Sequence, residues 1–227
     1  MRLGPDGFHD RREAGRLLAE RLAPLSVPTP VVLALPRGGV PVAYEVARAL
    51  RAPLDLILVR KIGAPGHEEY AIGAVVDGEP PQVVRNEAVI AALRVPESYI
   101  AEETARQVAE IARRRAAYLG PRPPLPVEGR TAIVVDDGIA TGATVKAALR
   151  GLARARPARL ILAVPVAPPE VLAELRPLVD ELHCLLAPDP FRAVGLFYDD
   201  FSQTADEEVV TLLEQASAHR FGEKAPR

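Results

Sequence analysis

Two adjacent carboxylates and the turn after them are the residues best suited to chemistry in this chain. Asp136 and Asp137 end an apolar run and lead into a Gly- and Thr-rich turn, which continues as an Ala/Leu-rich helix. The turn consists of Gly138, Ile139, Ala140, Thr141, Gly142, Ala143 and Thr144. Unpaired backbone N–H groups at a helix start attract a phosphate, and the threonine hydroxyls add donors. Because the carboxylates would repel a bare phosphate, the segment predicts a ligand that joins a phosphate to hydroxyls and brings a cation such as Mg²⁺.

Two other loops carry charge beside glycine. In PRGG, at 36–39, Arg37 supplies positive charge, while Gly38 and Gly39 let backbone N–H groups approach a ligand. The segment RKIGAPGHEEYAIG, at 60–73, predicts a long flexible loop. Its Lys61 is one of three lysines among 28 basic residues, and an ammonium differs chemically from a guanidinium. The alternatives are an ordinary turn for the first loop and a solvated surface loop for the second.

The elements that must position these loops alternate along the chain. Apolar runs that begin near residues 31, 54, 131, 159 and 181 predict strands, and helical patterns follow most of them. This alternation is typical of an α/β fold with a mostly parallel sheet of about five strands flanked by helices. Ligands bind at the carboxyl ends of such strands, so we expect the three loops to meet around one ligand.

Additional elements surround this predicted core. Helices are expected at 9–23 and 204–218, and a helical stretch at 87–119 that breaks near Val95–Pro96. A hairpin is expected around a turn at Gly78–Pro81.

Composition excludes several classes of partner and location. The formal net charge is -2 over 227 residues, so the chain lacks the basic field that nucleic acid or an anionic membrane attracts. No apolar run is long enough to cross a membrane, and the first residues lack the apolar stretch of a secretory signal. The single Cys184 excludes an internal disulfide and suits a reducing compartment, so we expect a cytoplasmic protein.

The segment IVVDDGIATGAT, at 133–144, resembles the 5-phosphoribosyl-1-diphosphate (PRPP) motif of type I phosphoribosyltransferases. The resemblance implies that Asp136 and Asp137 bind the ribose hydroxyls and hold Mg²⁺, partly through the ligand and water. It also implies that residues 138–144 bind the 5′-phosphate. PRGG is similar to the family's pyrophosphate loop, which implies pyrophosphate contacts for Arg37, Gly38 and Gly39 and a non-proline cis peptide at Pro36–Arg37.

Residues 60–70 resemble the flexible catalytic loop of the family, and their RK-x-G start is similar to that of adenine phosphoribosyltransferase. The resemblance implies that Arg60 and Lys61 contact the pyrophosphate and that Lys61 acts in catalysis. Glu68 and Glu69 are candidates for proton transfer. The sequence departs from the 6-oxopurine enzymes, which place an Asp where Ala140 stands.

The implied reaction is the Mg²⁺-dependent transfer of the phosphoribosyl group of PRPP to a nitrogenous base, with release of pyrophosphate. We interpret residues 1–227 as a single domain, with its core at about 28–190 and a small hood from about 1–27 and 189–227. In the hood, Phe197 or Tyr198 is expected to stack on the base, and the alternative is that these rings fill the core. The insert 87–119 serves either the hood or a contact between copies in a homo-oligomer. A non-catalytic PRPP- or nucleotide-binding regulator on the same fold is the alternative function.

Overall fold

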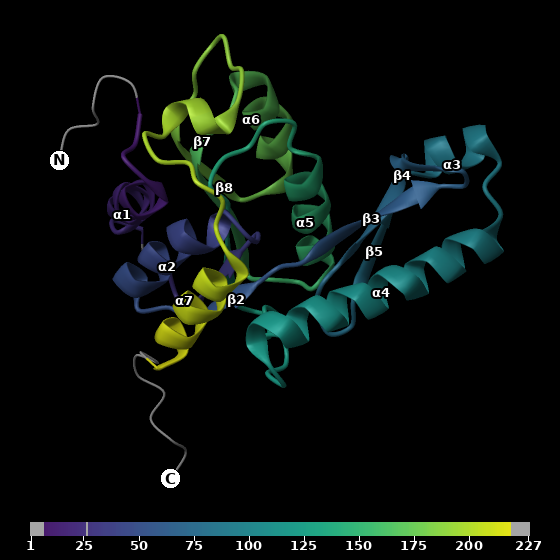
Figure 1. The fold of residues 1–227 in the computed structure, drawn as a ribbon, viewed down its shortest axis with the longest axis horizontal. Helices are drawn as coiled ribbons and strands as arrows, with labels where there is room; N and C mark the ends of the chain where they lie inside the picture. Colours follow the sequence, from purple (N-terminus) through teal and green to yellow (C-terminus); the bar gives the residue numbers. More distant parts are fainter. Residues whose placement is uncertain (1–6, 26, 219–227) are drawn as a thin grey trace.

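Five parallel strands form the central sheet, in the order β2–β1–β6–β7–β8 (Figure 1). The computed structural model of the chain describes residues 7–25 and 27–218. The strands are β1 (Pro30–Ala34), β2 (Leu54–Leu56), β6 (Thr131–Val135), β7 (Arg159–Val166) and β8 (Glu181–Leu186). Apart from their first residues, β1 and β7 are buried throughout, as is β6, which explains their unbroken apolar sequences. The predicted α/β fold with a five-stranded, mostly parallel sheet is confirmed.

Helices cover both faces of this sheet. One face carries α1 (Arg11–Leu22), α2 (Gly39–Leu50) and α7 (Asp206–Ala218), and the other carries α5 (Ala143–Arg154) and α6 (Pro169–Leu175). Successive side chains of a strand point to opposite faces, so Val32 packs in the first core and Val31 in the second. None of the helices in the described part of the chain is both long and apolar enough to cross a membrane.

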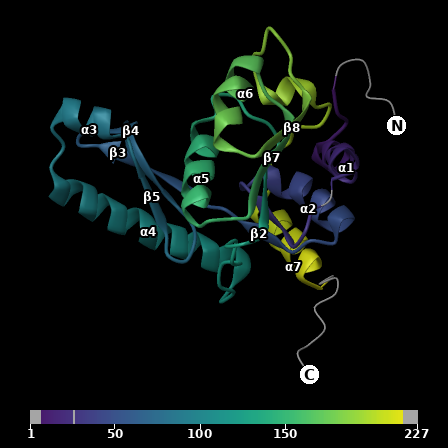
Figure 2. The same ribbon diagram turned by 180° about the vertical axis from the view of Figure 1, so that it is seen from behind.

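A three-stranded antiparallel sheet extends from the central sheet as an arm (Figure 2). It contains β3 (Val59–Ala64), β4 (His67–Val76) and β5 (Gln82–Arg85), and it packs with α3 (Glu87–Leu93) and α4 (Glu97–Leu119). The predicted hairpin with its turn at 78–81 and the predicted helices at 87–119, with their break near Pro96, are confirmed.

The prediction of a long flexible loop at 60–73 is wrong, because these residues form most of β3, a tight turn and most of β4. Ile62 and Ile72 are buried against Ile100 and Ile111 of α4. Their burial gives the hairpin an apolar face. This face was not predicted from the sequence, because the glycines of the segment suggested a loop. Helix α2 begins at Gly39, so PRGG runs directly into a helix.

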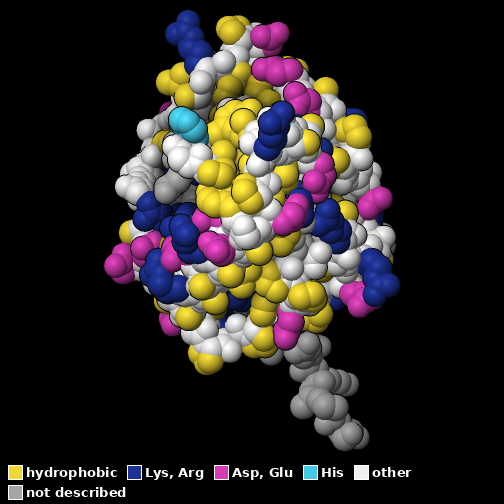
Figure 3. All heavy atoms as spheres, turned by 90° about the vertical axis from the view of Figure 1, so that its right-hand side faces the viewer, with side chains coloured by type: hydrophobic (Ala, Val, Ile, Leu, Met, Phe, Trp, Pro, Cys, Tyr) yellow, Lys and Arg dark blue, Asp and Glu magenta, His cyan; other side chains and the backbone are white. Residues whose placement is uncertain are grey.

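The tip of the arm exposes apolar side chains. Tyr70 and Leu93 lie there beside Ala64, Pro65 and His67, around a shallow hollow. Figure 3 views the molecule from the side of the arm and shows apolar side chains gathered on this face. A contact between copies of the chain through the insert stays a prediction.

A buried ion cluster joins the arm to the central sheet. Arg115 of α4 donates to both carboxylate oxygens of Asp55, over 2.6 and 2.7 Å, and to Asp77 Oδ2 over 2.6 Å. Asp55 follows Leu54 in β2, whereas Asp77 follows the last residue of β4. Burial is the main cause that raises the pKa of Asp77, and the Arg115 guanidinium opposes it. One cation therefore holds two buried carboxylates from two different sheets.

Replacement of Arg115 is expected to loosen this junction severely. The variant Arg115→Met leaves both carboxylates buried without their cation, and we expect a loss of about 3–5 kcal/mol in the free energy of unfolding. Urea denaturation measures this loss. The matched control is Arg113→Met, in the same helix, where the exposed arginine pairs with Glu110 at the surface and little change is expected. Equal effects of the two variants would contradict the anchoring role of Arg115.

Candidate functional site

Two of the three predicted loops meet at the carboxyl ends of β1 and β6. The backbone N–H of Leu35 donates to Val135 O over 3.0 Å, which continues the pairing of the two strands. A Cβ added at Gly38 would lie only 2.0 Å from Asp137 Oδ2, and one at Gly39 would lie 3.0 Å from Asp136 Cα. The carboxylate of Asp137 therefore requires a glycine at position 38, and the backbone at the end of β6 leaves little room for a side chain at position 39. The expected cis peptide at Pro36–Arg37 is present.

The predicted phosphate turn stands open at the start of α5. Gly142 precedes the helix with a φ of 74°, a conformation that favours glycine, and provides no side-chain cap. The first backbone N–H groups of α5 can therefore donate hydrogen bonds to a ligand. Ala140, Thr141, Ala143 and Thr144 are exposed, whereas Ile139 is buried and its N–H donates to Val166 O over 2.9 Å. This arrangement anchors the turn through Ile139 and presents its polar groups to solvent.

The two carboxylates are half-buried and differ in their partners. Asp136 Oδ1 accepts from the backbone N–H of Asp137 over 2.9 Å, and Asp137 Oδ2 accepts from Arg11 Nε over 2.7 Å. Burial, and next to it the negative charge of Asp137, raise the pKa of Asp136 well above its usual range. An acid with a raised pKa beside an open anion site is typical of a functional site.

Sequence reasoning missed Arg11. Its guanidinium also donates to Ser202 O over 2.7 Å and lies over the Phe201 ring at 3.9 Å. Arg11 is near one end of the chain and Phe201 near the other, so no local pattern connects them. The prediction that the two chain ends form one hood was the only signal available.

Backbone hydrogen bonds hold these two chain ends together. The N–H of Phe8 donates to Phe197 O over 2.8 Å, and the N–H of Asp199 donates to Phe8 O over 2.9 Å. Tyr198 is 8% exposed, its ring packs against Phe8 and Phe201, and its hydroxyl donates to Asp137 O over 2.5 Å. Tyr198 thus packs in the core and supports the backbone of Asp137, which favours the core-filling alternative, and base stacking by Tyr198 stays a prediction.

Phe197 has a different environment from Tyr198. Its ring is partly exposed and stacks on Phe191, with 5.6 Å between the ring centroids. Base binding by Phe197 stays a prediction.

The third predicted loop lies on the arm and not in the turn region. Arg60 Nε donates to Gln107 Oε1 of α4 over 3.0 Å, and the Lys61 side chain is exposed on β3. Glu68 and Glu69 belong to β4, but their side chains lie outside the described part of the structure. The pyrophosphate and catalytic roles of these residues stay predictions.

Arg37 lies in a hollow between α4 and α7. Its Nη1 is 3.6 Å from Asp206 Oδ1, and the same oxygen accepts from the Tyr118 hydroxyl over 2.6 Å. Arg113 and Arg114 of α4 also line this hollow. The insert therefore brings positive charge to the pyrophosphate loop, a contact that sequence reasoning did not predict.

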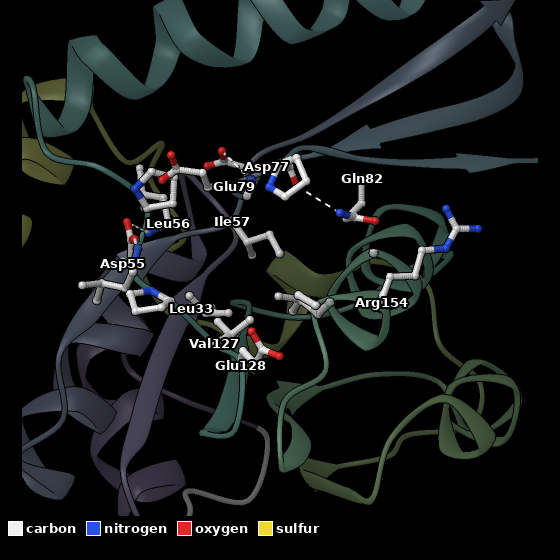
Figure 4. Close-up of a pocket in the computed structure, with 18 of the residues that line it drawn as sticks. Leu33, Asp55, Leu56, Ile57, Asp77, Glu79, Gln82, Val127, Glu128 and Arg154 are labelled. Carbon is white, nitrogen blue, oxygen red and sulfur yellow. Dashed lines mark hydrogen bonds between the residues drawn. The ribbon is translucent and has the colours of Figure 1, made fainter.

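A separate cavity of about 500 Å³ lies at the other end of α5 (Figure 4). Leu33, Ile57 and Val127 form an apolar part of its wall, while Asp77 and Glu79 bring negative charge. Because these carboxylates would repel a phosphate, the cavity is not an alternative to the turn at 138–144.

Comparisons with known proteins agree with this geometry. A model of the phosphoribosyl transferase domain family matches residues 11–200. Mycobacterium tuberculosis strains CDC 1551 and H37Rv each have a relative that is 47% identical over 210 residues, which is 92% of this chain and 47% of the relative. Their names assign these relatives to the phosphoribosyl transferases without giving a base. The chain thus spans about half the length of these relatives.

A solved structure is similar over nearly the whole described chain. The crystal structure of TT1426 from Thermus thermophilus is 46% identical and superposes with a TM-score of 0.80. The match covers 92% of this chain and 98% of that one.

Replacement of Asp136 by Asn is expected to stabilise the fold. The pKa of Asp136 is higher in the folded than in the unfolded chain. The free energy of unfolding therefore falls as pH rises from the usual pKa of an aspartate to the raised pKa of Asp136. This cost grows as pH rises above the usual aspartate pKa, and Asp136→Asn removes it while its side-chain oxygen can still accept from the Asp137 N–H. We expect a melting temperature higher by a few degrees at pH 7 and a smaller gain near pH 4.

Thermal unfolding between pH 4 and 8 measures this difference. The control is Asp199→Asn, an exposed acid of the hood, for which no such pH-dependent gain is expected. A destabilised Asp136→Asn variant at neutral pH would contradict the raised pKa.

Proposed function

The chain belongs to the phosphoribosyl transferase family, and from this premise we propose that it transfers the phosphoribosyl group of PRPP to a nitrogenous base and releases pyrophosphate. The observation that carries the proposal is the contact between the two loops. Gly38 lies directly against Asp137, next to a helix start with open N–H groups. A ligand that fits this place must offer hydroxyls to the carboxylates and one phosphate to each loop.

Different residues of the site bind different parts of PRPP. The turn at 138–144 receives the 5′-phosphate through backbone N–H groups and the hydroxyls of Thr141 and Thr144. Asp136 and Asp137 accept hydrogen bonds from the ribose hydroxyls. Arg11, already bound to Asp137, keeps that carboxylate in place and reduces its repulsion of the phosphates.

The donors present also fit Mg²⁺. Within the described ranges no three His, Cys, Asp or Glu side chains gather as a metal site, so a cation would need ligands from the substrate. Magnesium is commonly held by one or two carboxylates together with phosphate oxygens and water, and Asp136 and Asp137 supply the carboxylates. When bound with PRPP, the ion supplies positive charge to the diphosphate.

The transfer breaks the bond between the anomeric carbon and the diphosphate oxygen while a bond to the base nitrogen forms. Positive charge develops on the sugar and negative charge on the leaving group. Arg37 and the N–H groups of Gly38 and Gly39 stabilise the leaving diphosphate. The base nitrogen gives up its proton, and Glu68 or Glu69 is assigned to accept it. Arg60 and Lys61 are assigned to the diphosphate, which requires β3 to lie over the site during turnover.

One observation favours a second candidate function, a regulator that binds PRPP or a nucleotide without catalysis. Residues 60–70 form a hairpin packed on α4, where the resemblance implied a flexible catalytic loop. A chain that cannot close such a loop would bind PRPP but would not shield the anomeric carbon from water.

Calorimetry with PRPP and Mg²⁺ tests the binding part of the proposal. We expect saturable binding, and we expect Thr144→Ala to weaken it several-fold because a phosphate loses one hydroxyl donor. The control is Ser217→Ala, near the C-terminal end of α7, whose hydroxyl donates to Glu214 O. Absence of PRPP binding would refute the transferase and a regulator that binds PRPP.

Pyrophosphate release with a panel of purine and pyrimidine bases separates the two candidates. An enzyme releases pyrophosphate with at least one base, and Lys61→Ala lowers its turnover at least ten-fold while PRPP binding survives. The control is Lys146→Ala, since this lysine pairs with Glu174 on the outside of α5. PRPP binding without release for any base would support the regulator.

A further inference from the structure

The crossing of α1 and α2 buries a carboxylate on the side of the sheet away from the arm (Figure 1). The two helices approach so closely that a Cβ added at Gly15 would lie 2.6 Å from Val42 O and 2.9 Å from Glu45 Cβ. Only a glycine at this point of α1 permits the contact. As a result, the Glu45 side chain is 1% exposed.

Three arginines surround this one carboxylate. Arg12 Nε is 2.5 Å from Glu45 Oε1, Arg48 Nη2 is 2.6 Å from Oε2, and Arg16 Nη1 is 3.9 Å from Oε1. Among the described residues, Glu45 is the only acid within 4.0 Å that pairs with any of the three. Three positive charges against one negative charge leave a local excess of two.

The arginines hold this excess at the surface, where a ligand can reach it. Their side chains are 37%, 46% and 53% exposed for Arg12, Arg16 and Arg48. Arg12 is further fixed by the Tyr44 ring, 4.7 Å below its guanidinium. A guanidinium carries five N–H donors, and Glu45, with two oxygens for three arginines, satisfies only a few of them. The buried carboxylate thus orients three cations that repel one another.

We propose that Arg12, Arg16 and Arg48 form a binding site for a compact, multiply charged oxyanion of phosphate chemistry. Such an anion relieves the repulsion and accepts paired hydrogen bonds from planar guanidiniums. A monovalent anion would not balance the excess charge. The site lies outside the loops proposed to bind PRPP, because Arg11, the neighbour of Arg12, is directed to Asp137 instead.

Arginine-selective NMR tests the proposal with inorganic tripolyphosphate as the probe, in a metal-free buffer of low ionic strength. The Nε–Hε signals of Arg12, Arg16 and Arg48 report on this site alone, so binding at residues 138–144 does not interfere. We expect these three signals to shift saturably and the affinity to fall as salt is added. Signals that do not shift, or shift without saturation, would overturn the proposal.

Two variants and one control assign the effect to the cluster. Arg16→Ala/Arg48→Ala retains the Arg12–Glu45 pair, so Glu45 keeps a partner, and it should weaken tripolyphosphate binding about ten-fold or more. Arg16→Glu, at the loosest of the three pairs, should abolish binding. Arg94→Ala/Arg150→Ala removes two exposed arginines elsewhere and should change nothing. Equal effects in the double variant and the control would refute the site.

Two competing probes test the chemical class of the ligand. Single-stranded oligonucleotide and poly-glutamate are added under the same conditions. The concentration of each probe is expressed as its concentration of negative charges. If either polymer shifts the three signals at a lower such concentration than tripolyphosphate does, the cluster recognises a polyanion. The proposal of a compact oxyanion then fails. Because these measurements do not use PRPP, a failure of the proposed function leaves them interpretable.

Discussion

The pairing of β1 with β6 is the constraint on which the rest of the site depends. These parallel strands lie side by side in register, and Leu35 N and Val135 O extend the pairing beyond their ends. The loops that leave them must therefore occupy the same space. Gly38 and Gly39 are the residues that make this possible, since any side chain at Gly38 would overlap the carboxylate of Asp137. The two loops, which are proposed to bind the pyrophosphate and the ribose, are close enough to hold one ligand between them, which neither loop could do alone.

Arginine organises the carboxylates throughout the molecule. Arg11 holds Asp137 at the site, Arg115 joins Asp55 to Asp77 at the base of the arm, and three arginines gather on Glu45. All but three of the 28 basic residues are arginine, and a planar guanidinium can bridge two acceptors where an ammonium offers a single point charge. The compositional bias toward arginine thus has structural uses. The insert also adds arginines near the site, because Arg113 and Arg114 of α4 line the hollow beside Arg37.

The sequence predicted the site better where the chemistry is local than where it is assembled from distant segments. Strand, turn and helix start follow one another within residues 131–144, so the apolar run, the acids and Gly142 could be interpreted without knowledge of the fold. The expectation for residues 60–70 failed because glycine and charge suggested a loop, while the burial of Ile62 against α4 depends on a partner forty residues away. The environment of Tyr198 could not be predicted for a similar reason. An aromatic ring near the last strand suits either base stacking or the core, and Phe8, which packs against Tyr198, comes from the other end of the chain.

By itself, the sequence determined the α/β class, the five-stranded sheet and the strand–turn–helix segment at 131–144, which is proposed to bind ribose and phosphate, because periodicity and backbone requirements act over a few neighbouring residues. Only the tertiary structure decided that Arg11 pairs with Asp137, that the second loop needs glycine because of that acid, and that the insert packs as an arm. These features depend on which side chains meet across the fold. Charge pairing and close packing join residues far apart in the chain, and their partners leave no local pattern.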